Sequence, residues 1–284
     1  MAFADVAEAP LQEAVLSDEV PEEELSAVIA PDTVPTEEAL LMAKDNEAKI
    51  DTQEYATLQE AADKAQEGDT ITLLKSIEPE TRVRFSQDIT LTLDLDGHTF
   101  SSMDAGSFNA VLAAGSLTVQ NGTMTTGNAE GPFGVMAVAT GAKALIMKDV
   151  TLYNYKSYGQ CVDIRENIKA EFNNVRIVSN MGGGVTVGGG TADFYNCTFE
   201  QSGYYDHCSC NISASNGGVA TVYSGTYTSS DGYSAYVYNS GGIINIVDGT
   251  FSGNKAVLKA DYNNKAPAII NVLDGRFTGE IQKA

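Results

Sequence analysis

The chain has few basic residues, few cysteines and no long apolar run. Lysine and arginine number 17 against 38 acidic residues, which gives a formal net charge of −21. Nucleic acids and anionic membrane surfaces both require a basic footprint, so this balance argues against either partner. No apolar run approaches the roughly 20 residues that cross a bilayer, so we predict no membrane insertion. Four cysteines in 284 residues are too few for a disulfide framework.

Candidate metal ligands are also sparse. The segment His207-Cys208-Ser209-Cys210 is suggestive, but it lacks the paired spacing of a zinc site. We therefore predict no metal site and no cofactor. We expect Cys197 to face the core of the protein, where a thiol packs as a small apolar group.

The first fifty residues differ from the rest of the chain. Residues 1–50 contain 13 acidic residues against Lys44 and Lys49, so they carry about half of the net charge, together with four of the seven prolines. Such a segment buries too little apolar surface to offset its chain entropy, and we expect 1–50 to be disordered and the folded domain to span 51–284. Ala2 and Ala4 are spaced like the small residues before a signal-peptide cut, so we expect a secreted or cell-surface protein.

A short pattern recurs along residues 93–277. Apolar residues alternate with polar ones, a residue of the Asp, Asn or Ser type follows, and then a small or β-branched anchor residue. Alternation is typical of a strand with one buried face, and Asp or Asn before Gly is typical of a sharp turn. The anchors recur every 22–28 residues, which fits one coil of a three-sided solenoid. The eight anchors are Gly97, Gly122, Val150, Val175, Cys197, Gly225, Gly249 and Gly275.

We therefore predict an all-β fold: a right-handed parallel β-helix of about eight coils. A solenoid needs a cap because a terminal coil cannot bury its own face. Residues 57–65 read as an amphipathic helix in which Thr57 and Glu60 have the spacing of a capping box. We expect this helix to cap the N-terminal end and to lead directly into a first strand at 69–74.

These features resemble a known superfamily. The helix of Leu-Gln-Glu-Ala type, the strand beginning at Asp69, and the segment Leu93-Asp94-Leu95-Asp96-Gly97 are similar to the entry of the pectate-lyase-like β-helix superfamily. The later Val-Asp-Gly-Thr-Phe and Leu-Asp-Gly-Arg-Phe repeats are most similar to non-catalytic β-helix domains in surface proteins of gut Firmicutes. The resemblance covers about residues 55–284 and is specific for fold rather than activity.

One hypothesis for function is a polysaccharide lyase or glycoside hydrolase. The resemblance implies acidic residues with a Lys or Arg base for lyases, or clustered aspartates for hydrolases. The residues that could serve are Asp163, Arg165 and Asp193. However, a polyuronate favours a basic cleft, and residues 177–254 contain no Lys or Arg. Asp163 and Arg165 are more simply explained as an ion pair on a solvated strand face, so we assign no catalytic residue.

The preferred hypothesis is a non-catalytic binding module. Seven of the 13 tyrosines lie within 201–240. Exposed tyrosine offers a rigid contact area with a polar tip, which suits a glycan or a host protein such as an immunoglobulin or mucin. Packing of stacked tyrosines along the solenoid is the competing explanation, and Tyr227 falls at a core position. The expected binding residues are Tyr204, Tyr205, Tyr236 and Tyr238.

A third hypothesis is a passive spacer in a larger surface protein. Stacked coils can be extended without limit, so a solenoid suits this purpose even when it has no ligand. We rank the binding module first.

Overall fold

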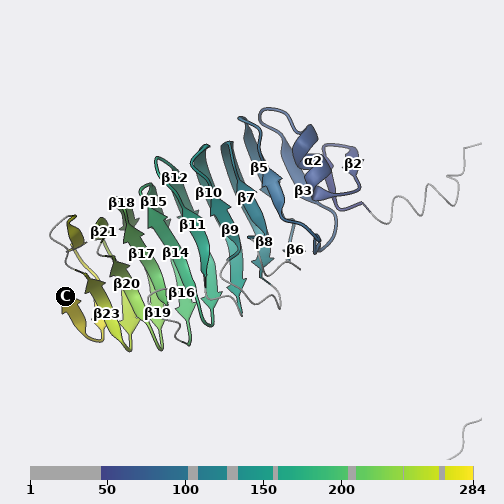
Figure 1. The fold of residues 1–284 in the computed structure, drawn as a ribbon. Helices are drawn as coiled ribbons and strands as arrows, with labels where there is room; N and C mark the ends of the chain where they lie inside the picture. Colours follow the sequence, from purple (N-terminus) through teal and green to yellow (C-terminus); the bar gives the residue numbers. More distant parts are fainter. Residues whose placement is uncertain are drawn as a thin grey trace, which may run out of the picture. The chain divides into compact units, whose positions relative to one another are not determined.

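The chain forms a parallel β-solenoid. The computed structural model describes residues 46–101, 108–126, 134–155, 159–203, 209–238, 240–261 and 266–283. These residues build about eight turns, and Figure 1 shows the coils stacked side by side from α2 at one end to the C-terminus at the other. The predicted fold class and coil number are confirmed.

One side of the solenoid is a nine-stranded sheet, here called sheet B. Each strand pairs in parallel with the strand one coil further along. Its strands, in order along the axis, are β4 (Val83–Phe85), β7 (Ala110–Leu112), β9 (Met136–Val138), β11 (Gln160–Ile164), β14 (Gly183–Gly188), β17 (Cys210–Ser215), β20 (Tyr233–Val237), β23 (Ala256–Ala260) and β26 (Ile281–Lys283).

The other sides belong to a 17-stranded sheet, here called sheet A, which bends at the repeated turn into two arms. The first arm, before the turn, comprises β3 (Thr70–Leu73), β5 (Thr90–Asp94), the starts of β8 (Gly115–Thr125) and β10 (Ala142–Asn154), then β12 (Lys169–Asn173), β15 (Thr191–Tyr195), β18 (Gly218–Val222), β21 (Gly242–Ile246) and β24 (Ala268–Val272).

The second arm follows the turn in each coil. It comprises β6 (Thr99–Phe100), the ends of β8 and β10, then β13 (Arg176–Ser179), β16 (Cys197–Gln201), β19 (Gly225–Ser229), β22 (Thr250–Gly253) and β25 (Arg276–Thr278). β8 and β10 run through the turn without interruption, whereas later coils break into two strands there.

The N-terminal end is capped as predicted, with one difference. Helix α2 (Leu58–Lys64) begins at Thr57, whose hydroxyl accepts a hydrogen bond from the Glu60 N–H at 3.1 Å. However, β1 (Ala48–Ile50) and β2 (Gln53–Tyr55) precede the helix, and β1 pairs antiparallel with both β2 and β3. Residues 46–50 are therefore part of the solenoid, which begins before the expected boundary at 51. The rest of the acidic segment lies outside the described residues.

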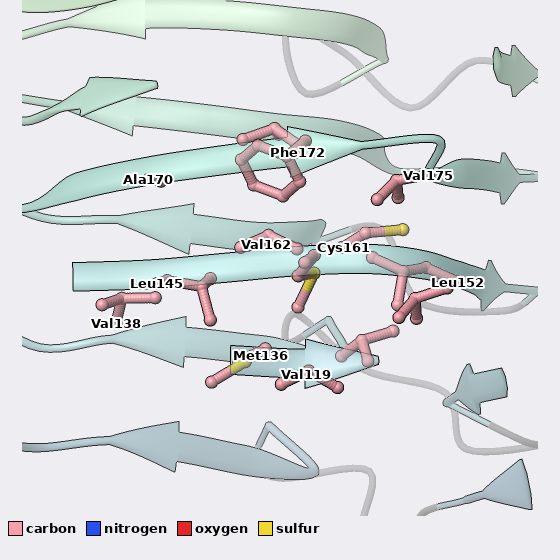
Figure 2. Packing of buried hydrophobic residues seen from close by; sticks show 14 of the residues in the cluster. Val119, Met136, Val138, Leu145, Leu152, Cys161, Val162, Ala170, Phe172 and Val175 are labelled. Atoms are coloured by element: carbon pink, nitrogen blue, oxygen red, sulfur yellow. The ribbon is translucent and has the colours of Figure 1, made fainter. Parts of the chain in front are cut away.

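The core lies between the sheets. Inward residues of both sheets are buried except towards the C-terminal end, where Ala268, Ile270 and Phe277 are partly buried. Figure 2 shows Leu145 and Phe172 of sheet A with Met136 and Val162 of sheet B in this core. Cys197 is also buried, as predicted. In the second arm the inward position is repeated in every coil, which stacks one side chain on the next; these are Phe100, Met124, Leu152, Ile177, Phe199, Tyr227, Phe251 and Phe277.

The repeated turn has two forms. In five coils the residue before the anchor takes the left-handed conformation; these are Asp96, Asn121, Asp149, Asn174 and Asn196, with φ between 46° and 59°. In the last three coils the anchor alone has positive φ, and it is always glycine: Gly225, Gly249 and Gly275. In the first coil both Asp96 and the anchor Gly97 have positive φ. The expectation that Asp or Asn permits the sharp turn is confirmed for the first form. In the last two coils the residue before the anchor is also Asp, and the carboxylates of Asp248 and Asp274 accept from the N–H of the glycine that follows, at 2.6 and 2.7 Å.

Candidate functional site

The predicted charged pair lies on the outer face of sheet B. Asp163 alternates with the buried Val162 and Ile164 on β11, so its carboxylate points outward. It lies 2.6 Å from Arg165 Nη2, and the two side chains are 17% and 57% exposed. Burial raises the pKa of Asp163, and the Arg165 guanidinium opposes that shift. The pair forms as the sequence predicted.

Further along sheet B the outer face becomes covered. The residues in register with Asp163 on successive strands are Thr186, Ser213, Tyr236 and Lys259. The hydroxyls of Thr186 and Ser213 are 2.8 Å apart. Ser213 is fully buried and Tyr236 is 1% exposed, so this part of the face offers little surface to a ligand.

Tyr236 and Tyr238 take part in an aromatic cluster. The Tyr236 ring centroid lies 5.1 Å from that of Tyr233 and 4.3 Å from that of Tyr238. The Lys259 ammonium lies 4.9 Å from the Tyr236 centroid, and the Tyr236 hydroxyl donates to Asp261. Burial raises the pKa of Tyr236 well above its usual range. Its ring is therefore packed rather than presented to solvent, while Tyr238 is half-buried. Tyr204 and Tyr205, the other predicted binding residues, lie outside the described residues.

Asp193 does not join Asp163 and Arg165. It lies on β15 in the first arm of sheet A, with its side chain on the outer face of that sheet, whereas Asp163 and Arg165 lie on or beside β11 of sheet B. The three residues proposed for catalysis therefore do not form one site.

Asp193 instead lines a depression on the outer face of the first arm. The depression measures about 480 Å³, and its lining includes Ala144, Lys169, Glu171, Asp193, Val219 and Thr221. Glu171 and Asp193 are register partners on the adjacent strands β12 and β15, and Thr221 follows on β18. Small side chains such as Ala144 lie among longer ones, which hollows the surface.

The environment of Asp193 disfavours its charge. Partial burial raises its pKa, a hydrogen bond with Thr221 opposes the shift, and the negative charge of Glu171 adds to it. Lys169 lies two residues before Glu171 on β12. No ion pair of Lys169 is found within the described part of the chain. The depression thus combines carboxylates, a cation and a hydroxyl that can all bind polar groups.

Two stacked tyrosines flank the depression. Tyr195 lies two residues after Asp193, and its ring stacks on Tyr223 with centroids 4.5 Å apart and planes 7° apart. Burial and then the negative charge of Asp193 raise the pKa of Tyr195 to about 12. Tyr223 is 38% exposed. A pair of aromatic rings beside convergent polar groups is typical of small-molecule and sugar sites.

Sequence reasoning missed this combination. Tyr195 and Tyr223 lie two residues before the anchors Cys197 and Gly225, and Glu171 and Asp193 lie four before Val175 and Cys197. These are the outward positions of the repeat. Comparing outward positions between coils, as was done for inward ones, places all four on one face.

Within the described ranges, no group of three or more His, Cys, Asp and Glu side chains is arranged to hold a metal ion. Nor does any helix there have the length and apolar character needed to span a membrane. Cys161 and Cys197 are buried free thiols, and Cys210 is buried as well.

Comparison with known proteins was made by sequence and by structure. No family model matches the chain, and no match was found among curated proteins or among solved structures.

Proposed function

We propose that this β-solenoid is a non-catalytic binding module that recognises a glycan on the outer face of the first arm of sheet A. The observation that carries the proposal is the depression of about 480 Å³ beside the Tyr195–Tyr223 stack. Sugars combine hydroxyl groups with apolar C–H faces. Carboxylates at Glu171 and Asp193 can accept from the hydroxyls, while the exposed Tyr223 ring can pack against a C–H face.

We further propose that the module acts at the cell surface or after secretion, and that it belongs with the non-catalytic domains of the pectate-lyase-like superfamily. The signal-like start and the Asp-Gly turns support these assignments. Recognition of a host protein is a different outcome, which the experiment below separates from glycan binding.

Glycoside hydrolysis is a second candidate. Glu171 and Asp193 are register partners on neighbouring strands, and the raised pKa of Asp193 favours a protonated acid beside an ionised base. Binding is preferred because Glu171 is exposed on an open face, where water is not excluded from a reacting bond.

The test is a glycan array followed by calorimetry with the strongest ligand, using the wild-type protein and Tyr223→Ala. We expect the variant to bind about tenfold more weakly, because truncating an exposed aromatic contact costs about 1–2 kcal/mol. Tyr155→Ala is the matched control: Tyr155 is 43% exposed and stacks on Tyr153 at 5.2 Å, but it follows the second arm. The affinity of the Tyr155→Ala variant for the glycan should equal that of the wild-type protein.

Three other outcomes contradict the proposal. An equal loss of glycan affinity in Tyr223→Ala and Tyr155→Ala would show that the first arm is not the binding surface. Capture of a host glycoprotein that survives enzymatic deglycosylation favours protein recognition. Release of reducing sugar that is abolished in Asp193→Asn favours the hydrolase.

A further inference from the structure

The polar groups of the depression continue along the solenoid as a single row. Asp193 is in register with Thr221, Thr221 with Asn245, and Asn245 with Asn271. Together with Glu171 these residues form what we call the polar stripe: one outward hydrogen-bonding side chain in each of five successive coils. Asn271 Nδ2 donates to Asn245 Oδ1 at 2.9 Å, which orders the amides at its end.

Apolar side chains border much of the polar stripe on both sides. The outward residues before it in each strand change from Lys169 and Thr191 to Val219, Ile243 and Ile269. The outward residues after the stripe are the stacked Tyr195 and Tyr223, followed by Val247 and Leu273. The N–H groups of Val247 and Leu273 donate to Val222 O and Ile246 O in the preceding coils. Leu273 is 80% exposed. A ligand on the stripe would therefore meet hydrogen-bonding groups in the middle and apolar surface at its margins.

The stripe loses its charge along its length. Its two carboxylates, Glu171 and Asp193, lie at one end, and Thr221, Asn245 and Asn271 are neutral. No Lys or Arg occurs in residues 177–254. A polyanion would be repelled by these two carboxylates, which Lys169 offsets only in part, and a polycation would gain at that end alone. A neutral ligand fits the whole stripe.

The stripe crosses five neighbouring strands in register. Neighbouring strands lie about 4.8 Å apart, so five strands span about 19 Å between the first and last residues. A β-1,4-linked hexose polymer is an extended ribbon with hydroxyl edges and C–H faces, whereas an α-1,4-linked polymer coils. We propose that a neutral β-1,4-linked polysaccharide lies along the polar stripe, parallel to the solenoid axis. This inference rests on the proposed glycan-binding function and adds the ligand class and its direction.

The test is calorimetry with β-1,4-glucan oligomers of two to six units, and with an α-1,4-glucan hexamer for comparison. We expect affinity to increase with length until the stripe is filled, with the β-linked hexamer at least about tenfold tighter than the dimer. Asn245→Ala should weaken hexamer binding several-fold and leave dimer binding unchanged. Thr226→Ala is the control, since Thr226 is exposed on the second arm in a neighbouring coil.

The outcomes separate the two proposals. Three results would overturn binding along the stripe while leaving glycan binding at the depression unaffected. They are an affinity that does not depend on oligomer length, equal binding of the α-linked hexamer, and an Asn245→Ala variant that binds the hexamer like wild type. Preference for a cationic glucosamine oligomer or an anionic uronate oligomer of the same length likewise overturns the neutral ligand class alone. Failure of every oligosaccharide to bind overturns both proposals.

Discussion

The repeated turn has one backbone conformation in the early coils of this solenoid and another in the late coils. Around β8 to β16, Asn or Asp takes the left-handed conformation before a Gly, Val or Cys anchor, and Asn side chains link neighbouring turns, as in the 2.6 Å bond from Asn174 to Asp149. From β19 onward the anchor glycine takes the positive φ instead. The late form has φ between 128° and 144° at the anchor, a conformation that favours glycine.

The side chains on the outer face of the first arm also differ between the early and the late coils. Its early coils carry charged and polar residues, among them Asp94, Lys148 and Lys169, whereas its late coils carry Tyr223, Ile243 and Leu273. The inward stack also changes, from Met124 and Leu152 to Tyr227 and Phe251, whose rings stack at 4.8 Å. The repeat therefore presents two chemically distinct surfaces, and the proposed ligand site lies where they meet.

The largest expected effect separates the two turn forms. A Cβ at Gly225 would lie 2.2 Å from Cys197 O, and the φ of 128° is unsuited to alanine. Gly225→Ala should therefore lower the free energy of unfolding by about 3 kcal/mol or more. Asn196→Ala, at φ 52° in the preceding coil, should cost only about 1 kcal/mol. Urea denaturation of both variants measures the difference, and similar losses would refute the distinction.

A smaller effect concerns the carboxylate at the boundary between the two surfaces. Because the folded-state pKa of Asp193 is raised above its ordinary value of 3.8, its ionised form is disfavoured in the fold. Asp193→Asn should thus be more stable than wild type at pH 7. That advantage should shrink as the pH falls through the raised pKa and should vanish below 3.8, where the wild-type side chain is protonated in both states.

The matched control for this pH series is Asp163→Asn on sheet B. Its pKa is also raised by burial, but the substitution removes the partner of Arg165, so the gain in stability should be less. Thermal unfolding across pH 3–8 gives both curves. An Asp193→Asn variant that is less stable than wild type at pH 7 would contradict the raised pKa of Asp193 in the fold.

Much of the fold could be predicted because the inward positions repeat. The anchors, the alternation before them and the capping box at Thr57 and Glu60 placed the coils and α2 correctly. The antiparallel pairing of β1 was missed, since a three-residue strand beside an acidic segment has no periodicity to reveal it.

The site was harder to predict. The outward positions vary from coil to coil, so Tyr195 and Glu171 did not stand out. The burial of Tyr236 depends on contacts with Tyr233 and Lys259 on its own and the next strand, and these are fixed only once the register is known. Asp193 lies four residues before the anchor Cys197 and Asp163 lies twelve before Val175, so the repeat separates the two positions, and the structure places them on different sheets.

The most direct test of the account is a crystal structure of the protein with a β-1,4-glucan hexamer. The account predicts the sugar on the outer face of the first arm, with one ring against Tyr223, hydroxyls bonded to Glu171 or Asp193, and the chain crossing β18 and β21 towards Asn271. A hexamer bound instead on the outer face of sheet B, beside Asp163, would contradict it.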